Sequence, residues 1–387
     1  MSHRRLSDPQ TGPHGWGSAV STYPLRGAAE RLLFIDLLKA VGAQLIVLHH
    51  LAFYGPMSDW THRLAPDLVS WFSQDARMAV QIFLVVAGFL AARSMAPGAV
   101  PRNTPFMAQL GQRYVRTALP YIAALVVAML CTELARRWMA HDSVSPPPGL
   151  WQFLSHALLL HTLLDMDSLS AGVWYVAIDF QLYALLLAVL WLSRRLPASS
   201  AWAMAFTALL VAASLFHFNT DSDWDSWALY FSGAYGLGAL AYWTTHDDEA
   251  WRNGRWLMGA LVAMALMALT IDFRERIALA LMVCLALACA QRQGWLFTWP
   301  RSRVVAYLSR ISYAVFLLNF SVALVVNAWF TRYGSHDSVT QTGGVLLAWL
   351  ACNVAGALFY RWVEQPLGRL KLRRKPAAVL PLGSQKV

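Results

Sequence analysis

The sequence predicts an all-α integral membrane protein with about ten transmembrane helices and both termini in the cytoplasm. Of its 387 residues, 57% are hydrophobic and only 13% are charged, far from the composition of a soluble domain. The apolar residues also gather in runs near the roughly 20 residues that an α-helix needs to cross a bilayer. These observations exclude a soluble enzyme, a disordered chain and a disulfide-stapled scaffold.

Ten apolar runs define the predicted crossings. Several are shorter than a full crossing, so their ends are approximate. An eleventh run, 150–164, is short, carries His156 and His161 and follows three prolines; we expect it to lie at the interface or to tuck back into the protein. The ten runs are 34–53, 78–96, 114–132, 173–192, 201–218, 227–244, 256–272, 277–291, 305–328 and 343–362.

The basic residues support this count. With ten crossings and a cytoplasmic N-terminus, 23 of the 31 lysines and arginines fall on the inner side, seven on the outer side, and Lys39 inside a helix. This bias follows the positive-inside rule for an inner (plasma) membrane protein. If 150–164 crossed the membrane, Arg194 and Arg195 would lie outside. Because the basic residues are scattered, we expect a lipid bilayer and no nucleic acid as partner.

The chain divides into three predicted parts. Residues 1–30 are expected to form a mobile cytoplasmic tail, 31–366 the membrane domain, and 367–387 a basic cytoplasmic tail. The first apolar run is too long and too polar for a signal peptide, so we expect it to remain in the mature protein. The four cysteines lie in apolar runs without a C-x-x-C pair, which indicates packing residues and no metal site.

Ionisable residues in the first predicted helix suggest a functional track. Each costs roughly 2.5–3.5 kcal/mol at mid-membrane. Asp36 and Lys39 are three residues apart and can pair structurally. Lys39 and His50 are about 16 Å apart along the helix and share one face. His50 suits a general base near neutral pH or a structural bond to a backbone carbonyl, whereas His49 points elsewhere and is expected to pack.

A second acidic residue, Asp179, lies in the fourth run with Gln181 and Tyr183 close by in the sequence. It suits either a structural hydrogen-bond centre or a direct catalytic role, and the residues alone leave both open.

These residues resemble the acyltransferase-3 family of integral membrane acyltransferases. Asp36 to His50 is similar to the family's first helix, with His50 at the essential histidine and Lys39 in place of an arginine. Further similarities run in order along most of the chain. They are I-F-L-V-V-A-G-F-L from Ile82, with Phe83, Gly88 and Phe89; Arg113, Arg116, Pro120 and Tyr121; Trp174, Asp179, Gln181 and Tyr183; Ser312 and Tyr313, with Asn319 where the family has histidine; and Arg361, Glu364 and Pro366.

The resemblance implies a membrane O-acyltransferase that moves an acyl group, most often acetyl, from cytoplasmic acyl-CoA to a hydroxyl of a cell-envelope glycan or lipid-linked saccharide. Acyl-CoA is then a substrate, and no cofactor or metal is permanently bound. The implied catalytic residues are His50, Asp179 and Tyr183, with His50 as general base. The anionic donor would be bound by Arg113, Arg116 and Arg310 at helix ends and by Lys39 at the mouth of the track. Asn319 and Trp174 are candidates for oxyanion or acceptor contacts.

Two other functions fit the same residues. A transporter or flippase of a small envelope precursor could use Lys39, His50 and Asp179 as a proton relay, although no internal repeat is visible. A non-catalytic partner in a glycan-assembly complex would need the polar track only for structure.

Overall fold

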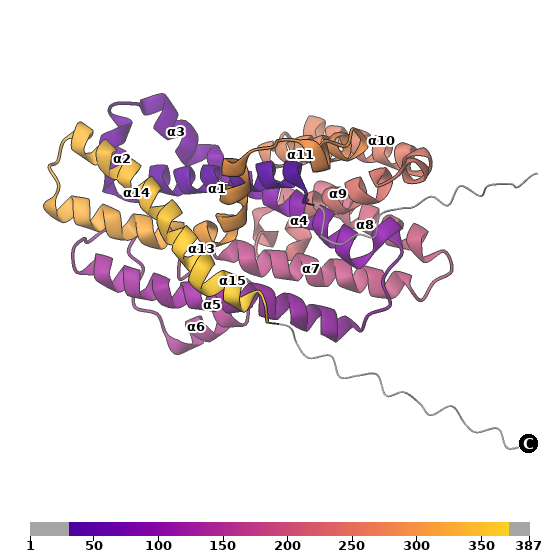
Figure 1. The fold of residues 1–387 in the computed structure, drawn as a ribbon, viewed down its shortest axis with the longest axis horizontal. Coiled ribbons are helices and arrows are strands. Elements are labelled where there is room, and N and C mark those ends of the chain that lie inside the picture. The colour runs from indigo at the N-terminus through magenta and orange to yellow at the C-terminus, as the bar shows by residue number, and fades with distance from the viewer. Residues whose placement is uncertain (1–30, 371–387) are drawn as a thin grey trace, which may run out of the picture. The chain divides into compact units, whose positions relative to one another are not determined.

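The computed structural model describes residues 31–370, which form helices and turns without a β-strand. Figure 1 shows the order of the helices along the chain. The predicted tails 1–30 and 371–387 lie outside the described residues. The helices are α1 (Leu33–Phe53), α2 (Pro56–His62), α3 (Pro66–Gln74), α4 (Val80–Met95), α5 (Phe106–Arg136), α6 (Leu150–Ala157), α7 (Trp174–Ser193), α8 (Ser199–Phe216), α9 (Ala228–Thr245), α10 (Asp248–Ile271), α11 (Glu275–Arg292), α12 (Trp295–Thr298), α13 (Arg303–Tyr333), α14 (Ser338–Phe359) and α15 (Gln365–Leu367). Short 3₁₀ turns lie at Ala76–Ala79, Pro97–Ala99, Phe218–Thr220 and Ser222–Trp224, and a π-helical turn at Tyr360–Glu364.

Each of the ten predicted crossings is a helix. Within the described part of the chain, eight helices are long and apolar enough to cross a membrane, and α9 and α11 are the two predicted crossings outside that set. Glycines and tyrosines lower the hydropathy of α9, and three charged residues lie in α11. The helices therefore indicate a multi-pass membrane protein, and eight of the predicted crossings qualify as membrane spans by length and composition.

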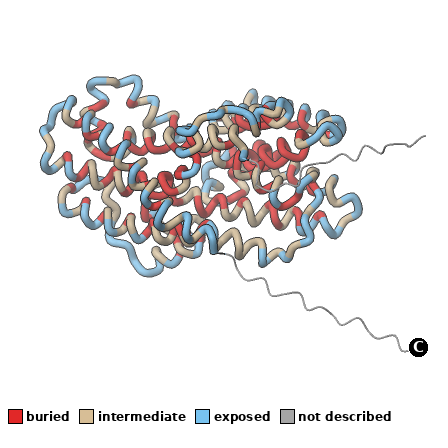
Figure 2. Tube along the Cα trace, in the orientation of Figure 1, coloured by how far each residue is buried: buried red, intermediate tan, exposed pale blue. Residues whose placement is uncertain are grey.

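Helix α9 is surrounded by protein, which explains its composition. Every residue of α9 except Leu229 is buried, and the helix packs against α4, α7, α8, α10 and α11. Figure 2 shows this concentration of buried residues in the tube. A Cβ on Gly88 would lie 1.9 Å from the Tyr235 carbonyl oxygen, and one on Gly238 would lie 1.9 Å from that of Val85. These glycines let the backbones of α4 and α9 touch, as small residues do between membrane helices.

Helices α5 and α13 are the longest in the described chain and extend beyond their predicted runs. Helices α5 and α13 have 31 residues each, about 46 Å, which exceeds the roughly 30 Å of a hydrocarbon core. An apolar run shows where lipid can surround a helix, but the backbone continues into polar sequence. Consequently Arg113, Arg116 and Arg310, expected at helix ends, lie within α5 and α13, two to three turns from their starts.

The segments that do not cross are also helical in part. Helix α6 has eight residues, about 12 Å, and is too short to span a bilayer. Helices α2 and α3, which the sequence analysis did not predict, fold the connection between α1 and α4. Each has proline in its first turn, Pro56 and Pro66, where a missing N–H costs nothing.

Contacts between loops group the helix ends. At one end, Arg194 donates to the Arg102 carbonyl at 3.4 Å and Trp243 donates to the Ala96 carbonyl at 2.8 Å. At the other end, Arg274 donates to Asn219 at 3.1 Å. The start of α5 and the end of α7 therefore lie at the same end of the helix bundle, so these two helices run in opposite directions. The short helix α6 between them does not cross the bundle.

Candidate active site

The polar side chains of α1 face α13. Helix α1 is continuous from Leu33 to Phe53, so Lys39 and His50 keep the separation of about 16 Å that a regular helix gives. Asp36 accepts a hydrogen bond of 2.6 Å from the Ser309 hydroxyl on α13. Lys39 lies within electrostatic range of Glu364. Near the opposite end of α1, His50 contacts Asn319 of α13.

The His50–Asn319 contact has a defined direction. The Asn319 amide nitrogen donates to the carbonyls of Val315 and Phe316, at 3.2 and 2.8 Å, so its oxygen is the atom that faces His50 Nδ1. An amide oxygen accepts only, hence Nδ1 carries the proton and donates. This arrangement leaves the Nε2 lone pair of His50 available to a reacting group.

The Nε2 atom of His50 is the candidate base. His50 is 5% exposed, yet its Nε2 has no hydrogen-bond partner among the described residues and is not among their fully enclosed unpaired atoms. Gly172 lies beside the ring: its φ is +83°, and a Cβ there would sit 3.4 Å from His50 Cε1. Glycine tolerates this φ and permits the close approach. By contrast, Nδ1 of His49 lies 3.2 Å from the Phe72 carbonyl, in agreement with its expected packing role.

Asp179 forms an ion pair with Arg113 instead of a contact with His50. The Arg113 Nη2 atom binds Asp179 Oδ2, and Arg113 stacks over the Tyr183 ring at 5.0 Å. The structure thus joins a predicted donor-binding residue to two predicted catalytic residues. Trp174 stacks on Phe231 at 5.5 Å.

Aromatic residues lie near both polar pairs. The rings of Tyr175 and Phe316 lie 5.4 Å apart, and Phe83 packs against both at 6.1 and 6.3 Å. Phe316 also lies beside Gly172, next to His50. Tyr175 is in electrostatic range of Arg113 and Asp179. These three rings form an aromatic wall that reaches from the surroundings of the His50–Asn319 pair to those of the Arg113–Asp179 pair.

The remaining predicted donor residues lie toward the Lys39 end. Arg116 and Arg310 are exposed, and Arg116 is in electrostatic range of Glu364, as is Lys39. In the sequence, Glu364 stands out only as part of a motif, and no pattern assigns a role to Tyr175, Tyr235 or Gly172. The position of Gly172, two residues before the Trp174 motif, is the feature of the sequence that could have drawn attention to it. Its contact with His50 could not be predicted, because that contact depends on the fold.

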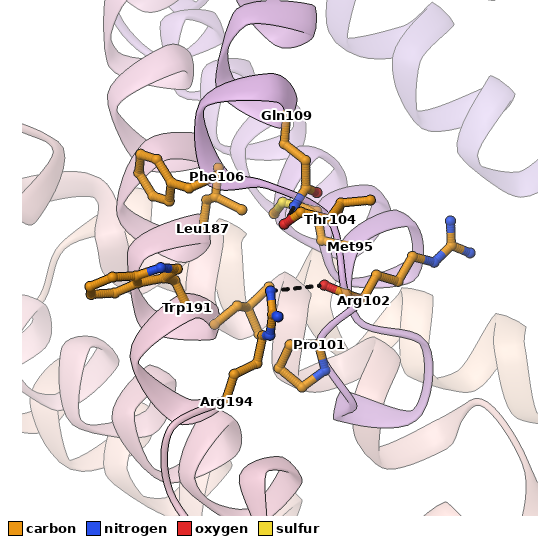
Figure 3. A pocket seen from close by; sticks show the side chains of 10 residues that line it. Met95, Pro101, Arg102, Thr104, Phe106, Gln109, Leu187, Trp191 and Arg194 are labelled. Carbon is orange, nitrogen blue, oxygen red and sulfur yellow. Dashed lines mark hydrogen bonds between the residues drawn. The ribbon is translucent and has the colours of Figure 1, made fainter. Parts of the chain in front are cut away.

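Two cavities in the described part of the chain lie away from the predicted site. The pocket in Figure 3, between the start of α5 and the end of α7, has about 10 Å³ and is lined by residues such as Arg102 and Arg194; that is room for about one water. A larger cavity of about 380 Å³ is lined by α8, α9 and α10, with Asp247 and Glu249 on its wall. Its carboxylates would repel a polyanionic donor.

Together these features define an integral membrane protein with a buried, amide-oriented histidine. Comparison with known families agrees: the family model described as an acyltransferase domain matches residues 32–362, most of the chain. The chain belongs to the acyltransferase-3 family. No curated protein and no solved structure matches it.

Proposed function

We propose that this protein is a membrane O-acyltransferase that moves an acetyl group from cytoplasmic acetyl-CoA to a hydroxyl of an envelope glycan or lipid-linked saccharide. The observation that carries the proposal is the orientation of His50: Asn319 accepts from Nδ1, and Nε2 is left unpaired. A neutral imidazole in this tautomer is suited to general-base chemistry.

The reaction follows from that tautomer. His50 Nε2 takes the proton of the acceptor hydroxyl while the hydroxyl oxygen attacks the thioester carbon. The resulting tetrahedral intermediate expels the CoA sulfur as the C–S bond breaks, and the imidazolium returns its proton to the sulfur. Asn319 stabilises the imidazolium through Nδ1 and holds the ring in place. It acts as a positioning residue for His50, in place of the oxyanion contact expected from the sequence.

The donor approaches from the Lys39 end of α1. Acyl-CoA is a polyanion, and Lys39, Arg116 and Arg310 are cations toward that end that can attract its phosphates. Lys39→Ala is expected to raise the KM for acetyl-CoA, whereas Lys39→Arg, which keeps the charge and introduces the family's residue, is expected to retain most activity. A loss of kcat without change in KM would contradict the donor role.

We also propose ten crossings of the inner membrane, with both termini cytoplasmic. The contact of the Arg194 and Arg102 loops supports an even number of passes between them. The charge bias supplies the orientation. A reporter fused after Arg195 is expected to read as cytoplasmic and one fused within Asp221–Asp225 as external; an external signal after Arg195 would overturn the ten-helix topology.

The contacts of Asp179 do not favour the proton relay that a transporter would need. Asp179 is paired with Arg113, and the Phe83–Tyr175–Phe316 wall reaches from the surroundings of that pair to those of His50. A proton relay needs polar groups in sequence, and two of these rings, Phe83 and Phe316, carry none.

The decisive assay uses the full-length protein, purified in detergent, with radiolabelled acetyl-CoA and a lipid-linked saccharide fraction from the expressing cells. Label in the saccharide, accompanied by release of CoA thiol, is the expected result. After reconstitution of the protein into sealed vesicles, transport of saccharide with no covalent label would instead support a flippase. His50→Ala serves as the inactive control.

A further inference from the structure

The Arg113–Asp179 ion pair lies among polar atoms that lack partners. The second carboxylate oxygen of Asp179, Oδ1, and the Nε of Arg113 are both fully enclosed without a hydrogen bond, and so is the hydroxyl of Tyr235. Tyr235 is 3% exposed and lies within electrostatic range of both charged residues. Unpaired enclosed polar atoms are costly and uncommon in folded proteins. Two of these three atoms belong to the ion pair and the third lies beside it, and together they offer one acceptor and two donors that a ligand can pair.

The fold holds Tyr235 firmly beside the pair. The residue lies in α9, the helix surrounded by protein, and its carbonyl is the atom against which Gly88 of α4 packs. Tyr175, Tyr183 and Tyr313 are also within electrostatic range of Asp179. Aromatic side chains from several helices thus lie near the ion pair, whose Arg113 side chain is 28% exposed, a suitable surrounding for a slender chain with few polar groups.

The pair lies between the Lys39 end of α1 and His50. Gly172 lies beside His50, and α7 then runs away from it. Asp179 is seven residues beyond Gly172, and the five helical residues from Trp174 to Asp179 span about 7.5 Å. A donor that enters near Lys39 and reacts at His50 must pass this level. An acceptor that enters from the His50 end need not.

We propose that Arg113, Asp179 and Tyr235 bind an amide group of the pantetheine arm of the acyl-CoA donor. Asp179 Oδ1 accepts the amide N–H, and the Tyr235 hydroxyl and Arg113 Nε both donate to the amide carbonyl oxygen, which has two lone pairs. A phosphate offers only hydrogen-bond acceptors and would be repelled by Asp179. A hydrocarbon chain offers neither donors nor acceptors. This assignment rests on the proposed function and names the part of the donor that the ion pair recognises.

The first test is Tyr235→Phe in the full-length purified protein, assayed by release of CoA thiol from acetyl-CoA. Loss of one hydrogen bond is expected to raise the KM for acetyl-CoA about 3- to 10-fold, with kcat within about twofold. Tyr121→Phe is the matched control, because Tyr121 is 0% exposed and also has an unpaired hydroxyl, but it lies outside the electrostatic range of Arg113 and Asp179. An unchanged KM in folded Tyr235→Phe would overturn the assignment.

The second test identifies the part of the donor. S-acetylpantetheine keeps both amides and lacks the nucleotide, so Tyr235→Phe should raise its KM by the same factor; an effect confined to acetyl-CoA would show that Tyr235 acts on the nucleotide part and overturn the proposal. Wild-type protein should also bind an S-acetylpantetheine analogue with ester in place of each amide about 3- to 10-fold more weakly. This arm needs no variant to fold.

The two proposals fail differently. If wild-type protein transfers acetyl groups and has equal KM values for the amide and ester donors, only the proposed amide site is contradicted. Wild-type protein that releases no thiol and labels no saccharide removes both.

Discussion

Two buried pairs that contain histidine, His50–Asn319 and His156–His161, differ in what they leave free. In the first pair, Asn319 occupies only Nδ1 of His50, and Nε2 remains unpaired without being fully enclosed. In the second pair, the rings stack 3.9 Å apart at 9° and both residues are 0% exposed. Burial is therefore common to both pairs, and an accessible nitrogen belongs only to the first.

The second pair is structural in its contacts. Nδ1 of His156 donates to the Gln152 carbonyl at 2.7 Å, and its Nε2 accepts from the Leu169 backbone N–H at 3.2 Å. Both nitrogens of His161 are enclosed without a partner. The pair joins α6 to the chain that follows it. Because His156 uses both ring nitrogens in hydrogen bonds, it has no lone pair left for a substrate. The comparison teaches that hydrogen-bond direction, more than burial, distinguishes a candidate base.

The largest expected effect is at His50. His50→Ala should lower kcat for acetyl transfer by about 10²- to 10⁴-fold, the usual contribution of a general base, while the KM for acetyl-CoA changes little because a base acts mainly in the transition state. His49→Ala is the matched control on the same helix and should stay near wild type. Undiminished transfer by His50→Ala would remove His50 as the base.

A smaller loss is expected at Asn319. Asn319→Leu should lower kcat about 10- to 100-fold, comparable to losing a group that orients a functional histidine, since Nδ1 loses its acceptor and the ring can take the wrong tautomer. Asn319→His, which introduces the family's residue and keeps a ring nitrogen as acceptor, should recover part of the rate. Equal rates for Asn319→Leu and wild type would show that Asn319 does not orient His50.

At His156 the expected effect is on stability. His156→Phe removes the acceptor of the Leu169 N–H and should destabilise the fold by about 1–3 kcal/mol, read as a lower melting temperature in detergent. Activity per folded molecule should be unchanged. A fall in kcat at normal stability would mean that the two histidine pairs share a function.

The smallest effect is expected at His161. Burial, with a smaller contribution from neighbouring His156, lowers the pKa of His161 to about 3. The unfolded chain binds a proton near pH 6.5 and the folded chain does not, so stability is complete above pH 6.5 and falls as the pH drops toward 3, by at most about 1.4 kcal/mol per pH unit.

His161→Phe tests this linkage. Because neither ring nitrogen has a partner, an aromatic replacement should leave the melting temperature at pH 7 unchanged or higher. Its melting temperature should also fall less than that of wild type between pH 7 and pH 5. An equal fall in both proteins would assign the acid sensitivity to other groups.

Much of the fold could be predicted because lipid imposes a simple rule. Every one of the ten predicted runs is a helix, since backbone groups in a bilayer must be satisfied within the segment. The ends of α5 and α13 could not be predicted. Hydropathy marks where the apolar run stops, but both helices continue into polar sequence, and hydropathy does not mark where the helix itself stops. Helix α9 was found as an apolar run, but its central position was not, since composition does not record which helices surround it.

Part of the candidate site could also be predicted. His50 and Lys39 stand out because ionisable residues are costly in lipid, and a helix fixes their common face. The partners of Asp179 and Asn319 could not be deduced, since Arg113 is 66 residues from Asp179 and His50 is 269 residues from Asn319. The sequence alone suggests separate roles for these residues, donor binding for Arg113 and an oxyanion or acceptor contact for Asn319.

The sequence by itself determined that this is a helical membrane protein of the acyltransferase-3 family, because hydropathy, helix period and motif order are local properties of the chain. Only the tertiary structure decided that His50 donates to Asn319, that Asp179 pairs with Arg113, and that an aromatic wall reaches from the surroundings of one pair to those of the other. These contacts join α1, α5, α7 and α13, and they depend on how helices pack and which atoms then lie within hydrogen-bond distance. A linear sequence does not specify that geometry residue by residue.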